Sequence, residues 1–180
     1  ANEFFDALPV HVLEKTAAGW MERTIAWDAR AAAFQYPVLA PPSFDPQPFL
    51  PPAVHDAPAG SVFEINRASQ DTAAAIARRI AVQGGAALII DYGPAASACG
   101  DSLQAVSAHG YADVFSNPGA YDITAHVDFA ALGRAAAGAG AQIWGAVPQG
   151  KFLLDNGMRI RAQRVGGDAT ARALHRLTAP

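Results

Sequence analysis

The first stretch of the sequence that could do chemistry lies at its start, where Asn2, Glu3 and Asp6 stand close together. A carboxylate and an amide at such a point can bind a cationic substrate or orient a nucleophile. Phe4 and Phe5 interleave with them and are expected to anchor the segment in the core. The spacing leaves one alternative open, because Asn2 or Asp6 could instead cap a helix.

The second stretch is Asp91-Tyr92-Gly93, which follows the apolar run Ala86–Ile90. A run that is continuous rather than alternating predicts a strand buried on both faces. In open α/β sheets, ligands bind outside the carboxyl ends of the strands. We therefore expect Asp91 or Tyr92 to face a ligand cleft; the alternative is that Asp91 caps a turn.

The third stretch runs from Tyr121 to Phe129 and holds His126 and Asp128. Asp128 is predicted to be a helix N-cap rather than a catalyst. His126 either lines the cleft or bonds a neighbouring carbonyl. A metal site needs a third ligand at suitable spacing, which the scattered histidines do not offer. No dinucleotide fingerprint, Walker loop, nucleophile elbow or zinc-protease motif is present.

In the first third of the chain, Val10–Glu14 and Trp20–Trp27 predict a hairpin. Asp28–Phe34 predicts one or two helical turns. The proline-rich segment 37–58 predicts a loop or an extended crossing, because proline fixes φ and removes a backbone donor. We expect large apolar residues to pin this loop to a surface, against the alternative of a flexible linker. These residues are Phe44, Phe49 and Leu50.

Strands and helices alternate in the remainder, which predicts an α/β fold with a mainly parallel sheet. The clearest helix, Ser69–Val82, has Ser69 as its expected cap and ends at a glycine pair. Besides 86–90, the predicted strands are Ser61–Ile65, Leu103–Val106 and Gln142–Val147. The other predicted helices are Phe129–Ala137, Gln149–Asn156, Arg159–Val165 and Ala169–Leu177, the last capped by Asp168.

Composition narrows the class of protein. With 180 residues, 51% of them hydrophobic, the chain can bury one good core and is expected to form a single domain. Its apolar runs are too short to cross a bilayer. A net charge of −3 argues against a nucleic-acid-coating surface. Arg159, Arg161 and Arg164 are expected to lie on a solvated helix face. The sequence begins at Ala1 without a start methionine, so we expect a piece of a longer protein.

Six strings carry a resemblance to a known family: Ala1-Asn-Glu-Phe-Phe-Asp-Ala-Leu-Pro-Val10, Gly19–Arg23, Gly84–Gly93, Asp101–Gln104, Asp122–Phe129 and Gln149–Leu154. In this order they resemble the MidA family of S-adenosyl-L-methionine-dependent methyltransferases. The resemblance implies an incomplete Rossmann-like class I methyltransferase sheet with a β-hairpin and helical additions. Residues 1–180 would be the C-terminal part of one domain, with the loop 37–58 inside it and the N-terminal glycine loop for the cofactor absent.

The resemblance implies S-adenosyl-L-methionine as cofactor and a protein arginine as methyl acceptor. Glu3, with Asp6, would be catalytic by holding the guanidinium in line with the methyl group, so that orientation supplies most of the acceleration. Residues implied to bind substrate or cofactor are Asn2, Asp91, Tyr92, Gln104, His126 and Asp128.

Mitochondrial members of the family assist assembly of respiratory complex I. The implied partner is therefore a protein substrate, which could be a respiratory-complex subunit. We expect no nucleic-acid partner and no membrane span, and the chain could form an oligomer. The implied location is the cytoplasm of a bacterium or the mitochondrial matrix of a eukaryote. Two alternatives remain: a non-catalytic assembly chaperone with the same fold, and another Rossmann-like enzyme such as a nucleotide-dependent oxidoreductase.

Overall fold

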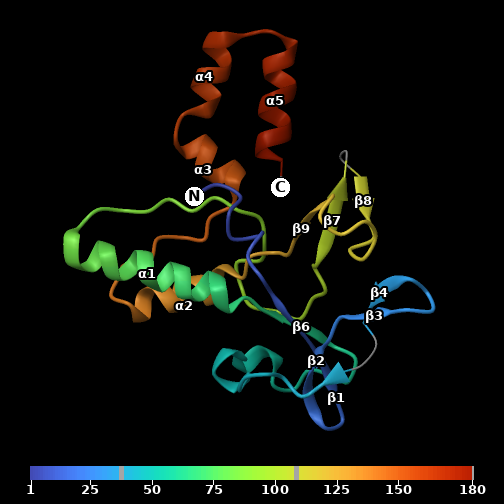
Figure 1. Ribbon diagram of the computed structural model, residues 1–180. Helices are drawn as coiled ribbons and strands as arrows, with labels where there is room; N and C mark the ends of the chain where they lie inside the picture. Colours follow the sequence, from blue (N-terminus) through green and yellow to red (C-terminus); the bar gives the residue numbers. More distant parts are fainter. Residues whose placement is uncertain (37–38, 108–109, 180) are drawn as a thin grey trace. The chain divides into compact units, whose positions relative to one another are not determined.

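A computed structural model describes residues 1–36, 39–107 and 110–179 (Figure 1). Pro37, at the start of the predicted proline-rich loop, and Pro180 lie outside the described residues. The chain divides into two compact units, Ala1–Ile143 and Trp144–Pro180.

A four-stranded antiparallel sheet in the first unit has the order β5-β2-β1-β6. The strands β1 (His11–Thr16) and β2 (Gly19–Arg23) form the predicted hairpin, with Lys15 opposite Trp20. The outer strands are β5 (Leu39–Ala40) and β6 (Val62–Ile65). The predicted strand 61–65 is thereby confirmed.

The proline-rich segment is pinned to this sheet, as predicted. Two short 3₁₀ turns, η1 (Gln47–Phe49) and η2 (Pro52–Val54), begin at or near prolines, whose fixed φ suits a helical first turn. Leu50 is buried against the sheet, and Phe44 and Phe49 pack at the edge of the same core. The core itself is formed by Leu13, Trp20, Leu50, Val54, Phe63 and Ile65.

The helical turns predicted over Asp28–Phe34 are wrong. The segment is a hairpin of β3 (Ala26–Asp28) and β4 (Ala33–Gln35). The Asp28 carboxylate accepts the N–H groups of Arg30 and Ala31 at 2.8 and 3.2 Å, which closes the turn. Across the pair, the rings of Trp27 and Phe34 meet edge-to-face at 5.1 Å. Cross-strand aromatic contact therefore outweighs the helix propensity of the alanine run.

The predicted helix 69–82 is α1 (Arg67–Gln83). Its cap is Asn66 rather than Ser69, because the Asn66 Oδ1 accepts the N–H of Ser69 at 2.8 Å. The Asn66 amide also donates to the carbonyls of Phe5 and Leu8, at 3.4 and 3.1 Å. One side chain thus starts the helix and ties it to the N-terminal segment.

The second long helix, α2 (Phe129–Gly138), lies beside α1 (Figure 1). Its predicted cap is confirmed: the Asp128 carboxylate accepts the N–H of Ala131 at 2.8 Å. The small buried residues Ala73 and Ala77 on α1 let the two helices approach closely. A second core joins Phe5, Ala73, Val127 and Leu132.

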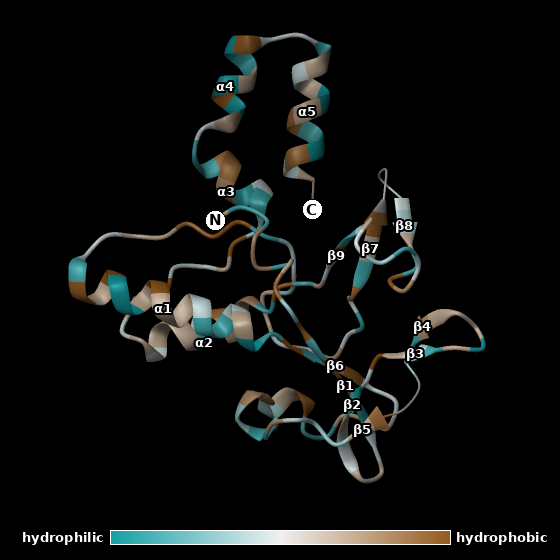
Figure 2. Ribbon diagram, viewed as in Figure 1, coloured by the Kyte–Doolittle hydropathy of each residue, from teal (hydrophilic) through white to brown (hydrophobic). Residues whose placement is uncertain are grey.

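The segment Ala86–Ile90 was expected to be a buried inner strand, and this is wrong for the described residues. Its pairing is one parallel bridge between Asn2 and Ile90. Leu88 is 57% and Ile90 37% exposed, although the segment carries the hydrophobic colour in Figure 2. A doubly buried strand needs a neighbour on each edge and helices on both faces. Here the segment pairs on one edge only.

The expected mainly parallel sheet is also not formed. Every pair of named strands in the described residues runs antiparallel. A three-stranded sheet, in the order β8-β7-β9, contains β7 (Gln104–Ser107), β8 (Gly110–Ala112) and β9 (Asp122–Thr124). The strand predicted over 103–106 corresponds to β7, whereas Gln142–Val147 forms no strand. The combination of sheets and helices nevertheless makes the fold α/β.

The second unit is helical, as predicted. It consists of α3 (Gln149–Asp155), α4 (Met158–Val165) and α5 (Asp168–Thr178). The cap of α5 is Gly167 and not Asp168, whose carboxylate instead sits in the first turn, where the helix dipole favours it. Arg159, Arg161 and Arg164 are exposed on α4, as a solvated face requires. In the described part of the chain, no helix has the length and apolarity to cross a membrane.

Asn66→Ala is expected to lower the free energy of unfolding by about 1–3 kcal/mol, because it removes a helix cap and two hydrogen bonds to carbonyls. Denaturant unfolding of the purified protein measures this. Arg78→Ala, at an exposed position of the same helix, is the matched control and is expected to change it by less than about 0.5 kcal/mol. Equal effects of the two substitutions would contradict the role of Asn66.

Candidate functional site

Two of the segments predicted to carry chemistry, residues 2–6 and 91–93, meet at the carboxylate of Asp91. Its Oδ2 accepts the backbone N–H groups of Phe4, Phe5 and Asp6 at 3.2, 3.0 and 3.3 Å. Its Oδ1 accepts the N–H of Tyr92 at 2.9 Å. Asp91 therefore caps a turn, which was the alternative prediction. The turn is formed by residues 3–6 and not by the residues that follow Asp91.

The backbones of the same two stretches are also joined. The nitrogen of Ala1 donates to the carbonyl of Leu88, and the N–H of Ile90 donates to the carbonyl of Ala1, both at 2.9 Å. The N–H of Glu3 donates to Ile90 at 2.9 Å. Residues far apart in the sequence are therefore held in one fixed register.

Glu3 stands at the bend that follows this pairing. Its φ is 45°, in the left-handed region that residues other than glycine rarely adopt. Glu3 and Asn2 are exposed, and their side chains make no hydrogen bond or ion pair with the described residues. Glu3 thus presents an uncommitted carboxylate at the surface.

Asp6 is the opposite case, because it is only 5% exposed. Its Oδ2 accepts the phenolic O–H of Tyr92 at 2.6 Å, and its Oδ1 is buried without a partner among the described residues. A buried carboxylate oxygen without a donor is costly, and such atoms often mark functional positions. Burial of the phenol and then its hydrogen bond to Asp6 raise the pKa of Tyr92 above its usual range.

Polar side chains continue from this pair to the three-stranded sheet. The hydroxyl of Thr124, at the end of β9, lies close to the phenol of Tyr92 and partly offsets the rise in its pKa. The Nε2 of Gln104 on β7 donates to the hydroxyl of Thr124 at 3.3 Å. Such networks of polar groups fix the orientation of each member.

His126 lies at the exposed side of the same cluster. Its ring meets that of Tyr92 edge-to-face, with centroids 5.7 Å apart. The backbone N–H of His126 donates to the hydroxyl of Ser102 at 2.8 Å. Ser102 is held in turn by the Glu64 carboxylate, which accepts both its hydroxyl and, at 2.9 Å, its N–H.

The segment that carries His126 is tied down on both sides. The N–H of Ala125 donates to the carbonyl of Asp6, and that of Val127 to the carbonyl of Tyr92, both at 3.0 Å. Gly93 allows this approach, since a Cβ there would lie 2.1 Å from the carbonyl oxygen of Val127. Three stretches of sequence therefore converge on one place.

The structure gathers most of the predicted site residues. Asn2 joins through its backbone, and Asp128 is turned toward the first turn of α2 as its cap. Contact of any of these residues with a substrate or cofactor stays a prediction. Side-chain hydrogen bonds or ring contacts place five of them in one cluster, and Glu3 directly precedes the bound segment. The five are Asp6, Asp91, Tyr92, Gln104 and His126.

Sequence reasoning missed four residues that support this cluster. Asn66 had a signal, because asparagine just before a predicted helix is a favoured N-cap residue. Ser102 and Thr124 belong to strings that carry the family resemblance. Glu64 had no local signal, since its pairing with Ser102 depends on the tertiary structure.

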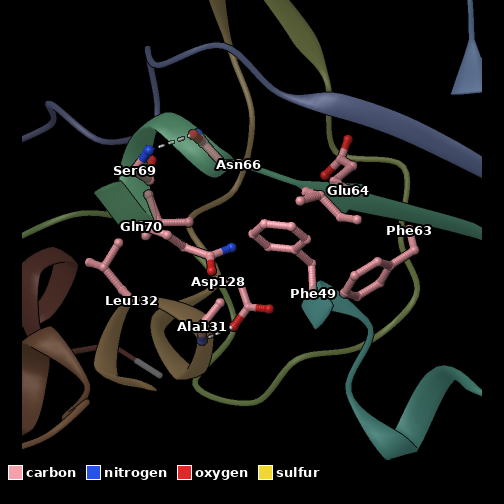
Figure 3. Close-up of a pocket in the computed structure, with 11 residues that line it drawn as sticks. Phe49, Phe63, Glu64, Asn66, Ser69, Gln70, Asp128, Ala131 and Leu132 are labelled. Atoms are coloured by element: carbon pink, nitrogen blue, oxygen red, sulfur yellow. Dashed lines mark hydrogen bonds between the residues drawn. The ribbon is translucent and has the colours of Figure 1, made fainter. Parts of the chain in front are cut away.

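A small cavity lies beside the cluster (Figure 3). Its volume is about 20 Å³, enough for about one water molecule. Pockets for drug-sized ligands are roughly 300–1,000 Å³, so this cavity does not fit a cofactor such as S-adenosyl-L-methionine. It lies between the starts of α1 and α2, and the residues labelled around it are Phe49, Phe63, Glu64, Asn66, Ser69, Gln70, Asp128, Ala131 and Leu132.

A second hollow, of about 340 Å³, lies in the helical unit. Pro148, Leu154 and Thr178 are among the residues that line it, and none of the predicted site residues does. Within residues 1–36, 39–107 and 110–179, no three His, Cys, Asp or Glu side chains are placed to hold a metal ion.

Residues 1–147 match a family described as "Putative S-adenosyl-L-methionine-dependent methyltransferase". The chain belongs to this family. The methyltransferase resemblance predicted from the sequence is thereby confirmed at the level of the family.

Two solved structures from Burkholderia thailandensis are similar to the chain. An uncharacterized protein is 28% identical with a TM-score of 0.80, and the match covers 99% of this chain and 50% of that one. A "likely methyl transferase" bound to S-adenosyl-homocysteine is 33% identical with a TM-score of 0.79, over 99% of this chain and 48% of that one. The fold is therefore a methyltransferase-like α/β fold.

Similar curated proteins are the mitochondrial protein arginine methyltransferases NDUFAF7. The chain is 36% identical to that of Homo sapiens over 161 residues and 39% identical to that of Mus musculus over 166 residues. Each match covers 89% of this chain. The chain spans about a third of the length of these relatives, 35% and 36% respectively.

Tyr92→Phe is expected to lower the free energy of unfolding by about 1–3 kcal/mol, because it leaves the buried Asp6 carboxylate without its donor. Denaturant unfolding measures the change. Tyr111→Phe is the matched control, since Tyr111 is 85% exposed. A Tyr92→Phe protein as stable as the control would show that the hydrogen bond contributes nothing.

Gly93→Ala is expected to destabilise the protein by roughly 1–3 kcal/mol or more, because backbone must move to admit the Cβ. The melting temperature in a thermal scan measures this. Gly100→Ala is the control, because a Cβ there meets nothing within 4 Å. Wild-type stability of the Gly93 variant would mean that Tyr92 and Val127 do not pack as described.

Proposed function

We propose that this chain is part of an S-adenosyl-L-methionine-dependent methyltransferase that modifies protein arginine. The observation that carries the proposal is the similarity, at 33% identity over 99% of the chain, to a structure bound to S-adenosyl-homocysteine. That molecule is what remains of the cofactor after its methyl group has left. The names of the NDUFAF7 relatives support arginine as the acceptor.

We assign the described residues to the acceptor side of such a reaction, because Glu3 offers an exposed carboxylate and the 20 Å³ cavity beside the cluster cannot enclose a cofactor. We propose that residues 1–180 form part of a larger methyltransferase domain, with the loop 37–58 inside it. When bound, S-adenosyl-L-methionine would supply the methyl group.

Glu3 is the proposed guanidinium ligand. Its carboxylate is exposed and uncommitted, and it stands on a bend fixed by backbone hydrogen bonds. A carboxylate accepts two parallel N–H groups of a guanidinium, which fixes the plane of the group. The unpartnered Oδ1 of Asp6 offers a second acceptor close by in the sequence. Together the two would orient the nitrogen that is methylated.

The remaining predicted contacts belong to the same proposal. Asn2 is exposed beside Glu3, and Tyr92 and His126 present aromatic rings at the exposed side of the cluster. Gln104 orients Tyr92 through Thr124. Asp128 is committed to capping α2, so any acceptor contact would use its remaining lone pairs.

Glu3→Gln in the full-length protein is expected to slow methyl transfer on the order of 10²-fold, because the neutral amide orients a guanidinium poorly. The measurement is transfer of labelled methyl groups from S-adenosyl-L-methionine to an arginine-rich peptide. Calorimetry is expected to show unchanged cofactor binding. A peptide with lysine in place of arginine should accept no label.

Asp56→Asn is the matched control, because Asp56 is exposed and has no side-chain partner in the described part of the chain. It removes the same unit of charge without touching the site. Turnover of the Glu3 variant equal to that of this control would refute the role of Glu3. If the wild-type protein binds no S-adenosyl-L-methionine at all, the non-catalytic chaperone replaces the enzyme as the proposal.

A further inference from the structure

The carboxylate of Asp91 is committed mainly to the backbone. Each of its two oxygens offers about two lone-pair sites. Its Oδ2 accepts the N–H groups of Phe4, Phe5 and Asp6 and is fully used, and its Oδ1 accepts the N–H of Tyr92. Glu3 and Asp6 differ in this respect, because each keeps at least one oxygen without a partner in the described residues.

The arrangement of the donors suits a carboxylate, because three of them come from consecutive residues. Successive backbone N–H groups that converge on one point form a concave site for an anion. Hydrogen bonds to a charged acceptor are about twice as strong as those between neutral groups. The negative charge of Asp91 is therefore compensated by the backbone of residues 4–6.

What the anion fixes is the bend that carries Glu3. The residue adopts φ 45°, immediately before the three bound N–H groups. A left-handed glutamate is unfavourable in a free chain. Without an acceptor for the N–H groups of Phe4, Phe5 and Asp6, the bend would relax and the Glu3 carboxylate would point elsewhere.

We propose that Asp91 is a positioning residue that acts through Glu3, and that it binds neither substrate nor cofactor. This inference rests on the proposed function, in which Glu3 holds the acceptor guanidinium. It replaces the expectation from the sequence that Asp91 itself contacts a ligand. Asp91 and Glu3 then form one functional unit, and removing either has the same consequence.

A double-mutant cycle in the full-length protein tests this. Asp91→Asn leaves one accepting oxygen in place of two and is expected to slow methyl transfer to an arginine-rich peptide by about 10- to 100-fold. In the Glu3→Gln background the same substitution is expected to cost nothing further, because effects of residues that act as a unit are not additive. If the two losses multiply, Asp91 contributes independently and the proposal is wrong.

A second variant covers the case in which Asp91→Asn folds poorly. Asp91→Glu keeps the charge but moves the carboxylate outward by one methylene group. The positioning role predicts reduced turnover for this variant with unchanged binding of S-adenosyl-L-methionine in calorimetry. Wild-type turnover would overturn the proposal. Asp122→Asn is the matched control, because Asp122 is exposed on β9 and makes no side-chain hydrogen bond in the described ranges.

Amide hydrogen exchange gives a readout that needs no activity. The amides of Phe4, Phe5 and Asp6 are expected to exchange faster in Asp91→Asn, while the amide of Ala131, bound by Asp128, stays protected. Unchanged exchange at residues 4–6 would overturn the proposal. If the wild-type protein transfers no methyl group, the proposed function fails, and the exchange measurement still decides whether Asp91 holds this bend.

Discussion

The Asp91 carboxylate fastens the N-terminal segment of the first unit to the segment that precedes Tyr92. Backbone pairing between residues 1–3 and 88–90 amounts to one short parallel bridge, which would be weak by itself. The anion adds four hydrogen bonds to N–H groups, three of them from the opposite segment. Because charge-assisted bonds are the strong ones, this contact sets the path of residues 3–6. Every other member of the candidate site is placed relative to that path.

Next to the bend, a line of polar groups runs from the buried Asp6 to Tyr92, Thr124 and Gln104 nearer the surface. Burying such groups is tolerable only where they satisfy one another. The line is complete at one end and open at the other, at Oδ1 of Asp6. That oxygen is buried without a donor among the described residues, and such atoms often mark functional positions.

Helices were the best predicted part of the fold. Both α1 and α2 follow from apolar spacing, and α2 also from its cap Asp128, which are local signals; the cap of α1 was assigned to Ser69 instead of Asn66. The errors lie where distant residues decide. The Asp28–Phe34 segment pairs through Trp27 and Phe34 instead of coiling. The apolar Ala86–Ile90 run resembles a buried strand in the sequence, yet its burial depends on neighbours that its own residues do not contain.

The sequence by itself determined the types of chemical group present, the hairpin of β1 and β2, the main helices and, through the strings near residues 1–10 and 122–129, the family. It also named most of the side chains that meet in the cluster. Only the tertiary structure decided their roles. Asp6, Asp91 and Glu3 are equivalent carboxylates in the sequence. In the fold Asp6 is buried with one oxygen satisfied, Asp91 accepts four backbone N–H groups, and Glu3 is exposed without a side-chain partner in the described residues. The reason is physical: the reactivity of a carboxylate depends on which donors reach its lone pairs, and those donors come from residues far away in the chain.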